Sequence, residues 1–343
     1  MLNLSDIELL SQLYSIHSLT GEEWELIDFV RKYVAAYVPS AKVRIDGWGN
    51  LYITKGKGPY PTLVCHLDQV QALHSVDFEV RQEEDNLIGW SNTPLTGKAT
   101  EGHREGLGAD DKNGIFVTLR CLEECPKLKV FMAVGAENGC IGSNCANMDF
   151  FLNSLYVLEP DCKGGTEVHT VLRGIPCASA EFEQALRLEE YGMSITEGKT
   201  SDILALTLKG IGVSCANIPA GYHNPHKDDE YTSLAELENT LWMVKKTVTA
   251  LEQRFPHRYL TPTQQRILEF NGLTDSELSE MQKSAREEMS HYKQLLNQTF
   301  DRTERDLLQQ KYNATKQLAD SIKEYRKYEN ALDRESISAQ FDD

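Results

Sequence analysis

Residues 113–134 read NGIFVTLRCLEECPKLKVFMAV and contain two different hydrophobic patterns, one after the other. In residues 113–124 the apolar side chains recur every three or four positions, which predicts an amphipathic helix. Residues 129–134 are almost wholly apolar, which is typical of a strand buried on both faces near the centre of a sheet. A helix that leads directly into such a strand is the repeating unit of an α/β fold.

The same alternation extends in both directions from this unit. Strands are predicted at 42–45, 50–54, 61–65, 155–158 and 213–218, and helices near 5–15 and at 142–151, 181–191, 201–209 and 233–251. A further helix is expected to begin at Thr20, because Thr20 and Glu23 have the spacing of a capping box. The predicted fold is a three-layer α/β/α sandwich with a mixed, largely parallel sheet, in which residues 69–106 form an excursion at one edge.

The chain is expected to divide into residues 1–255, a catalytic domain, and residues 256–343, a helical extension. From Thr274 to the end there is no proline or glycine, and apolar residues recur at irregular intervals of three and four. This pattern predicts two long amphipathic helices, arranged as a helical hairpin or a coiled coil. The helices could pack against their own catalytic domain or join copies of the chain into a homo-oligomer.

Composition excludes several classes of partner. The 343 residues include 52 acidic and 35 basic side chains, a net charge of -17 that repels nucleic acid and anionic membrane surfaces. The first ten residues lack the features of a signal peptide, and no apolar run approaches the roughly 20 residues of a membrane helix. The expected location is therefore cytoplasmic. The eight cysteines form no CxxC pairs, which argues against a structural zinc module.

Four polar segments follow predicted strands, and a fifth, residues 106–114, precedes the helix predicted at 113–124. The five segments are 65–68 (CHLD), 106–114 (GLGADDKNG), 135–143 (GAENGCIGS), 158–161 (LEPD) and 221–230 (GYHNPHKDDE). In extended chain, residues two apart point the same way, so Asp68 could orient the ring of His66 while the other ring nitrogen binds metal. A histidine in such a pattern is, however, more often structural.

Each remaining segment also has two interpretations. Asp110 and Asp111 could cap the helix that follows, or one of them could bridge two cations. Glu137 follows an apolar strand, where an ionised carboxylate is costly unless it is paired or carries protons. Taken together, the ordered set of His, Asp, Glu, Asp and His at strand ends is a ligand set for zinc with oxygen and imidazole donors.

This ordered set resembles the co-catalytic di-zinc exopeptidases, which include the tripeptidase called peptidase T, glutamate-type carboxypeptidases and leucyl aminopeptidases. The resemblance covers roughly residues 4–251. It implies a zinc-peptidase-like fold in which Asp110 bridges two zinc ions, and it assigns the other roles to matching positions. His66 and Asp161 would complete one metal site, His226 would belong to the other, Glu137 would be the general base, and Asp68 would orient His66.

Two features depart from that family. Asn138 stands where the family usually has a second Glu, and a neutral amide is a weak ligand, so one or two zinc ions are expected. Only 64 residues lie between Asp161 and His226, too few for the inserted lid domain of the tripeptidase-like members. The oxyanion donor that a lid would bring must come from elsewhere, and the candidates are His223, Tyr222 and Arg173.

The sequence therefore predicts a zinc-dependent metallohydrolase, an exopeptidase of the aminopeptidase or di/tripeptidase kind that acts on a peptide or small amide. One alternative is an amidase or deacylase acting on a non-peptide amide through the same site. The other is a catalytically weakened scaffold that assembles through its helical tail. Asn138 and the tail favour the scaffold, whereas the otherwise intact set of site residues opposes it.

Overall fold

The computed structural model describes residues 2–71, 73–93, 102–260, 273–299 and 302–338. The chain forms two compact units, Met1–Tyr259 and Leu260–Asp343. In the described part of the first unit, the main sheet has nine strands. Their bounds are β1 Lys42–Ile45, β2 Leu51–Lys55, β3 Tyr60–His66, β7 Leu128–Ala133, β8 Ser154–Cys162, β9 Glu167–Leu172, β10 Ile175–Pro176, β11 Ser194–Gly198 and β12 Cys215–Pro219.

The centre of the main sheet is parallel. The strand order is β1-β2-β7-β3-β8-β12-β9-β10, and β11 pairs with β9. Strands β7, β3, β8 and β12 are parallel to one another, whereas β1, β2, β9 and β10 join by antiparallel pairing. The prediction of a mixed, largely parallel sheet is confirmed. Its consequence is that four central strands deliver their carboxyl ends to one edge, where ligands gather in open α/β sheets.

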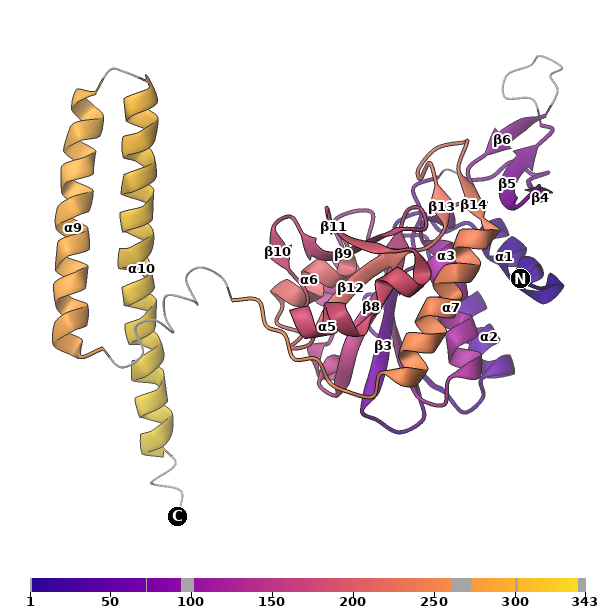
Figure 1. Ribbon diagram of the computed structural model, residues 1–343, viewed down its shortest axis with the longest axis horizontal. Coiled ribbons are helices and arrows are strands. Elements are labelled where there is room, and N and C mark those ends of the chain that lie inside the picture. Colours follow the sequence, from indigo (N-terminus) through magenta and orange to yellow (C-terminus); the bar gives the residue numbers. More distant parts are fainter. Residues whose placement is uncertain (1, 72, 94–101, 261–272, 300–301, 339–343) are drawn as a thin grey trace. The chain divides into compact units, whose positions relative to one another are not determined.

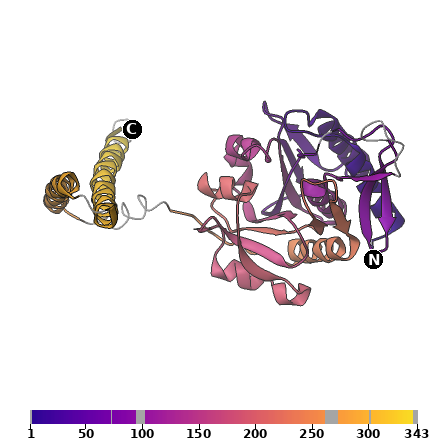
Figure 2. The same ribbon diagram turned by 90° about the horizontal axis from the view of Figure 1, so that it is seen from above.

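Helices cover both faces of the main sheet (Figures 1 and 2), which confirms the predicted sandwich. One face is covered by α1 Leu4–Ser15, α2 Trp24–Tyr37, α3 Ala109–Glu124, α5 Ala180–Ala185 and α7 Leu234–Ala250. The other face is covered by α4 Ile141–Cys145 and α6 Asp202–Leu208. Short 3-10 helices occupy Met148–Phe151 and Leu188–Tyr191.

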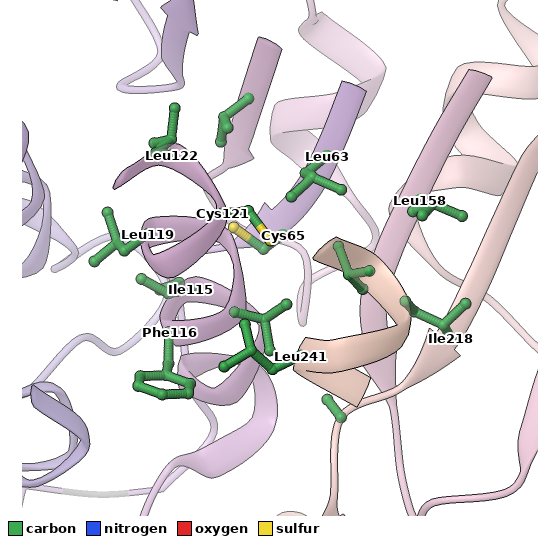
Figure 3. Close-up of a cluster of buried hydrophobic side chains, with 14 of the residues drawn as sticks. Leu63, Cys65, Ile115, Phe116, Leu119, Cys121, Leu122, Leu158, Ile218 and Leu241 are labelled. Atoms are coloured by element: carbon green, nitrogen blue, oxygen red, sulfur yellow. The ribbon is translucent and has the colours of Figure 1, made fainter. Parts of the chain in front are cut away.

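Strand periodicity divides the core between these faces. Leu63 and Cys65 of β3 point toward α3, while Val64 between them belongs to the core on the other face. Figure 3 shows Cys121 of α3 next to Cys65, both fully buried, so these thiols serve as small apolar side chains. Each large aliphatic side chain buried here stabilises the fold by about 1.5–3 kcal/mol. The core therefore holds α3, and the residues at its N-terminus, firmly against the sheet.

A second sheet lies within the same unit. Its five described strands are β4 Glu79–Glu83, β5 Asn86–Ser91, β6 His103–Glu105, β13 Tyr222–His223 and β14 Tyr231–Ser233. The excursion predicted at 69–106 supplies β4, β5 and β6, all antiparallel. The hairpin of β13 and β14 pairs with β5 and carries the polar segment 224–230 at its tip. This sheet thus positions part of the candidate site.

Three predicted helices differ from those observed. Helix α2 begins at Trp24 rather than Thr20, and Glu23 at its N-cap makes no capping hydrogen bond. The helix predicted at 142–151 is broken because the Asn147 side chain accepts a hydrogen bond from Asp149 N and starts a separate 3-10 turn. The helix predicted at 181–191 is broken where Arg187 adopts a left-handed backbone conformation.

The second unit is a helical hairpin, which is one of the two arrangements predicted from the sequence. Helices α9 Asp275–Gln298 and α10 Arg302–Ser338 pack through Leu278, Ile322 and Tyr325. Thr315 Oγ1 donates to Glu288 Oε2 at 3.3 Å, and Arg326 Nη2 donates to Ser279 Oγ at 2.6 Å. The contact of residue 288 is to residue 315, whereas that of the earlier residue 279 is to the later residue 326, so the two helices are antiparallel. Among the described residues, no helix is both long and apolar enough to cross a bilayer.

Candidate metal centre

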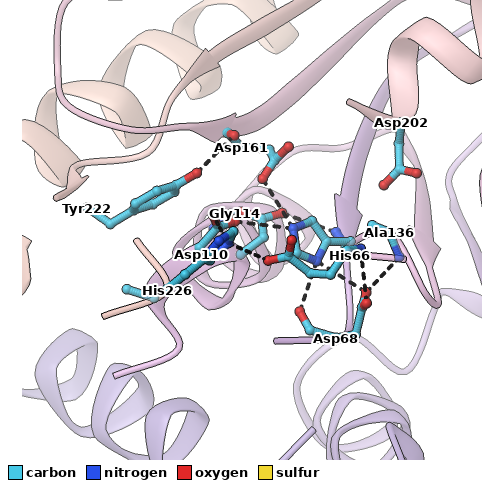
Figure 4. A network of polar contacts seen from close by, with 12 residues as sticks. His66, Asp68, Asp110, Gly114, Ala136, Asp161, Asp202, Tyr222 and His226 are labelled. Carbon is cyan, nitrogen blue, oxygen red and sulfur yellow. Dashed lines mark hydrogen bonds and ion pairs between the residues drawn. The ribbon is translucent and has the colours of Figure 1, made fainter. Parts of the chain in front are cut away.

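Five side chains predicted to act together lie at the carboxyl edge of the main sheet, and Figure 4 labels four of them, His66, Asp110, Asp161 and His226. His66 is the last residue of β3, and Asp161 is next to last in β8. Asp110 lies at the start of α3, where its peptide bond to Asp111 is cis. Glu137 follows β7, and His226 comes from the loop between β13 and β14. The parallel strands β3 and β8 bring His66 and Asp161 together, and the antiparallel hairpin of the second sheet adds His226.

The imidazole of His66 has a defined orientation. Its Nδ1 donates to the carbonyl oxygen of Asp68 at 2.9 Å and lies 3.4 Å from the Asp68 carboxylate. Both neighbours are acceptors, so Nδ1 carries the proton. Nε2 lies 3.2 Å from Asp110 Oδ1 and 3.3 Å from Asp161 Oδ1. A lone pair facing two carboxylate oxygens is repulsive unless a proton or a metal ion lies between them.

The imidazole of His226 faces the other side of Asp110. Its Nε2 lies 3.2 Å from Asp110 Oδ2 and 2.8 Å from Glu137 Oε1. Asp110 thus presents one carboxylate oxygen to each imidazole, which is the arrangement of a bridging ligand. Glu137 Oε1 is buried and meets no donor with hydrogen-bond geometry among the described residues. Asn138 is exposed on the turn that follows Glu137.

Charges at this edge favour cations. Contacts with Asp110 and then Glu137 raise the pKa of His226 to about 10. Burial opposes protonation of His66, but the charge of Asp161 and hydrogen bonds to Asp110 raise its pKa well above the usual value. Burial alone would raise the pKa of Asp110, yet its contacts with the two imidazoles lower it. Without a metal, the negative charge of the surrounding carboxylates therefore favours the protonated form of both imidazoles.

The donor set fits a divalent metal. Ligand atoms of His66, Asp110 and Glu137 lie within 4.8 Å of one another, and so do those of His66, Asp111 and Asp161. Imidazole nitrogen and carboxylate oxygen are common zinc ligands. Asp111 already accepts from His66 N at 3.1 Å and Gly114 N at 3.0 Å, so it fixes the backbone around the site. Asp111 therefore supports the backbone, whereas Asp110 faces the two imidazoles.

Asp68 is tied to both halves of the site. Its carboxylate accepts from Ala136 N at 2.8 Å, Glu137 N at 3.1 Å and Thr20 Oγ1 at 2.7 Å. Glu23 Oε1 accepts from Gly135 N at 3.1 Å, so it holds the same loop. The capping-box reading of Thr20 and Glu23 was wrong for this reason: both side chains form tertiary contacts with the site. Their sequence spacing alone does not distinguish the two uses.

Glu230 is a further supporting residue that sequence reasoning did not assign. It is fully buried, and its Oε2 accepts from Gly108 N at 2.7 Å, Ala109 N at 3.2 Å and Gln71 Nε2 at 2.9 Å. Its Oε1 lies 3.4 Å from the donor Asp110 N. Burial raises the pKa of Glu230 to about 7. The carboxylate thus anchors the backbone that presents Asp110, and only its position in a polar-rich loop hinted at this role.

A cleft of about 730 Å³ opens onto the centre and is lined by His66, Asp110, Glu137, Asp161 and His226 among others. Two of the three candidate oxyanion donors also line it. Tyr222 is buried and donates from its hydroxyl to the carbonyl of Asp161 at 3.1 Å, whereas Arg173 is exposed. The third, His223, is absent from the described lining; it pairs with Glu236 at 2.6 Å and stacks on Tyr231.

A second acidic pair lies beside the centre, and sequence reasoning assigned no role to it. Glu159 of β8 and Asp202 of α6 are 0% and 1% exposed, and Glu159 Oε1 accepts from Asp202 N at 3.0 Å. Burial raises the pKa of Asp202 to about 6, although the charge of His66 opposes the shift. Burial also raises the pKa of Glu159 well above the usual value. Asp202 looks in sequence like an ordinary acidic residue at a helix start.

No protein-family model and no curated protein matches the chain by sequence. Solved structures match its fold. Aminopeptidase PepT from Bacillus cereus ATCC 10987 is 14% identical with a TM-score of 0.57, covering 71% of this chain and 97% of that one. Aminopeptidase APDkam598 from the archaeon Desulfurococcus kamchatkensis is 18% identical with a TM-score of 0.54, covering 72% and 95%. The TET1 peptidase of Pyrococcus horikoshii, which can assemble into a tetrahedron or a large octahedral shell, is 14% identical with a TM-score of 0.50, covering 72% and 100%. The chain therefore has the fold of these aminopeptidases, as the resemblance implied.

Proposed function

We propose that this chain is a zinc-dependent hydrolase that acts as an exopeptidase on short peptides. The observation that carries the proposal is the shared carboxylate: Asp110 offers one oxygen to His66 and the other to His226, at 3.2 Å each. The cleft of about 730 Å³ is of the size that accommodates a small ligand rather than a folded protein. Both features suit hydrolysis at the end of a peptide.

The proposed ligand roles are as follows. His66, Asp161 and Asp110 would hold a first zinc ion, and His226 with the other oxygen of Asp110 would hold a second. The second site lacks a carboxylate where Asn138 stands, and an exposed amide is the poorer donor, so this site should bind zinc more weakly. Zinc bound at the centre would polarise the scissile carbonyl and make water acidic enough to deprotonate near neutral pH.

The protein's own groups would handle the proton and the orientation of the ligands. Glu137 takes the proton of the attacking water and passes it to the leaving nitrogen, a transfer worth roughly 10²–10⁴ in rate. Asp68 holds the proton on Nδ1 of His66, which leaves Nε2 for the metal. Arg173 is the proposed contact for the carbonyl oxygen, because it lines the cleft, whereas the single O–H of Tyr222 is already donated to the carbonyl of Asp161.

The decisive experiment compares Glu137→Gln with Glu197→Gln. Glu197 is an exposed carboxylate in the same cleft, and its Oε1 accepts from Gly174 N at 2.8 Å. Zinc content per chain is measured together with hydrolysis of a panel of aminoacyl and acyl-amino acid substrates. We expect Glu137→Gln to keep zinc and lose turnover by at least about 100-fold, while the control keeps both. Full turnover by Glu137→Gln would refute the proposal.

A further inference from the structure

Three buried polar side chains form a network at the base of the hairpin that carries His226. Tyr14 of α1, Asn113 of α3 and Thr232 of β14 are all fully buried. The hydroxyl of Tyr14 donates to Asn113 Oδ1 at 2.5 Å and lies 2.9 Å from Thr232 Oγ1. Asn113 Nδ2 donates to the carbonyl oxygen of Ala220 at 2.7 Å and to Thr232 Oγ1 at 3.1 Å. Asn113 thus contacts the hairpin at both of its ends.

The orientation of the Asn113 amide is fixed by its partners. The carbonyl oxygen of Ala220 can only accept, so Nδ2 must face it, and Oδ1 must face Tyr14. Thr232 Oγ1 accepts from Asn113 and has its own proton to donate to the hydroxyl of Tyr14 or to Asn113 Oδ1. Each donor in the network therefore has an acceptor. Such a network favours one arrangement, because a shift of any member leaves a buried polar group unpaired.

The network connects two residues that face each other in the candidate centre. Asn113 follows Asp110 by three positions in α3, and Ala220 and Thr232 flank the segment that contains His226. Residues 226–229 at the tip of the hairpin are exposed, so their position depends on the ends of the hairpin rather than on core packing. Figure 4 shows His226 beside Asp110, where Nε2 lies 3.2 Å from Oδ2.

Other contacts of the hairpin lead to different parts of the fold. Strand β14 pairs with β5, the hydroxyl of Tyr222 donates to the carbonyl of Asp161, and His223 pairs with Glu236 of α7. Glu230 holds the far end of the tip to the backbone at the start of α3. Asn113 holds the base of the hairpin to the next turn of the same helix. The hairpin is therefore attached at two points to the helix that presents the shared carboxylate.

We propose that Asn113, held in place by the hydroxyl of Tyr14, is a positioning residue of the second metal site. This inference rests on the proposed function, in which His226 and Asp110 share the second zinc ion. The network holds the hairpin so that His226 faces Asp110 before metal binds. A ligand that is already in place loses less conformational freedom on binding, which tightens the binding. The N-terminal helix thereby contributes to zinc affinity through a fully buried hydroxyl.

The first test measures hydrogen exchange in the metal-free full chain and compares Tyr14→Phe with Tyr156→Phe. Each substitution removes one hydroxyl from a fully buried ring, and that of Tyr156 donates to the carbonyl of Thr247 at 3.0 Å, between β8 and α7. We expect amides of residues 221–233 to exchange about 5–10-fold faster in Tyr14→Phe than in Tyr156→Phe, the change that corresponds to one lost hydrogen bond. Amides of β3 and β7 should exchange equally in the two variants. Equal exchange in the hairpin would overturn the inference.

The second test measures zinc affinity without turnover. Calorimetric titration against a competing chelator gives the affinities of the first and second zinc equivalents. Tyr14→Phe should weaken the second equivalent about 10-fold, as loss of a supporting contact does, and should leave the first unchanged, because the main sheet holds His66 and Asp161. Tyr156→Phe should change neither. An unchanged second equivalent in Tyr14→Phe, or equal weakening of both, would overturn the inference.

A second pair of variants makes the result independent of Tyr14. Thr232→Ser keeps the hydroxyl, whereas Thr232→Val replaces it with a methyl group of similar size. We expect Thr232→Ser to bind the second equivalent as the parent does and Thr232→Val to weaken it as Tyr14→Phe does. Because both hydroxyls belong to one network, the double variant Tyr14→Phe/Thr232→Val should weaken binding by less than the product of the two single effects. Independent effects, or equal weakening by Thr232→Ser and Thr232→Val, would contradict the network.

The outcome is separable from that of the proposed function. If the chain hydrolyses no amide or binds no second zinc ion, that part of the proposed function fails, and the exchange comparison in metal-free protein alone decides whether the network positions the hairpin. If the chain is an active two-zinc hydrolase and neither Tyr14→Phe nor Thr232→Val weakens the second equivalent, the hydrolase proposal stands and the positioning role fails.

Discussion

The support of Asp110 by Glu230 gives a prediction for Glu230→Ala. The substitution removes the acceptor of two buried backbone donors, Gly108 N at 2.7 Å and Ala109 N at 3.2 Å, and leaves the weaker contact to Asp110 N without a partner. Each buried donor left unsatisfied costs about 1–3 kcal/mol. Water that enters the space left by the side chain can satisfy part of these donors, so the total cost for the three donors should lie near the lower end of the range, about 3 kcal/mol. For a unit of this size, this is a decrease in Tm of roughly 6–12 °C.

The same substitution should weaken zinc binding, because Asp110 loses the backbone anchor that presents it. Removal of such a supporting contact typically costs about 10–100-fold in metal affinity. Thermal unfolding and competition with a chromophoric chelator measure the two effects. Asp228→Ala, an exposed carboxylate in the same loop, is the matched control. If Glu230→Ala lies within about 0.5 kcal/mol of that control and binds zinc equally well, the anchoring role is refuted.

Three further predictions follow from the site and the tail. His66→Ala should lose the first zinc equivalent and all turnover, by elemental analysis and assay; a full complement of zinc would contradict the ligand assignment. In metal-free protein, Glu230 has a native pKa of about 7 against 4.5 for an unperturbed side chain, so its contribution to the free energy of unfolding is full below pH 4.5 and is lost as pH rises to 7. Urea unfolding at a series of pH values should show that Glu230→Gln removes this part of the pH dependence of the free energy of unfolding. If the pH dependence is unchanged, a group other than Glu230 titrates in this range. A chain ending at Tyr259 should keep zinc and turnover but show a smaller assembly by light scattering if the tail joins copies of the chain; an unchanged mass would exclude that role.

The parts of the site that lie at strand ends were predictable from sequence. Apolar runs mark the central strands, and parallel pairing obliges the residues after them to meet, which brings His66 and Asp161 to a shared edge. Residues that act through tertiary hydrogen bonds were not predictable in this way. Thr20 has a local use as a helix cap that its sequence spacing favours, whereas its observed partner, Asp68, is 48 positions away.

The same limit applies to the edge of the sheet and to the floor of the cleft. Strand β9 has the alternating burial of a half-exposed strand and pairs with β11 and β12, but it was not among the predicted strands. Asp202 precedes a run of apolar helical residues, where an acid is ordinary. Only the fold reveals that it is buried beside Glu159.

The candidate centre draws its residues from two sheets that need not have equal stability. The main sheet holds His66 and Asp161, whereas the short hairpin of β13 and β14 carries His226 and Glu230, two and three residues per strand. A local opening of this hairpin would withdraw both side chains at once while the large core stays folded. Amide hydrogen exchange in the hairpin should therefore slow when zinc is added, and the lifetime of the complete centre would be set by these few hydrogen bonds rather than by global unfolding.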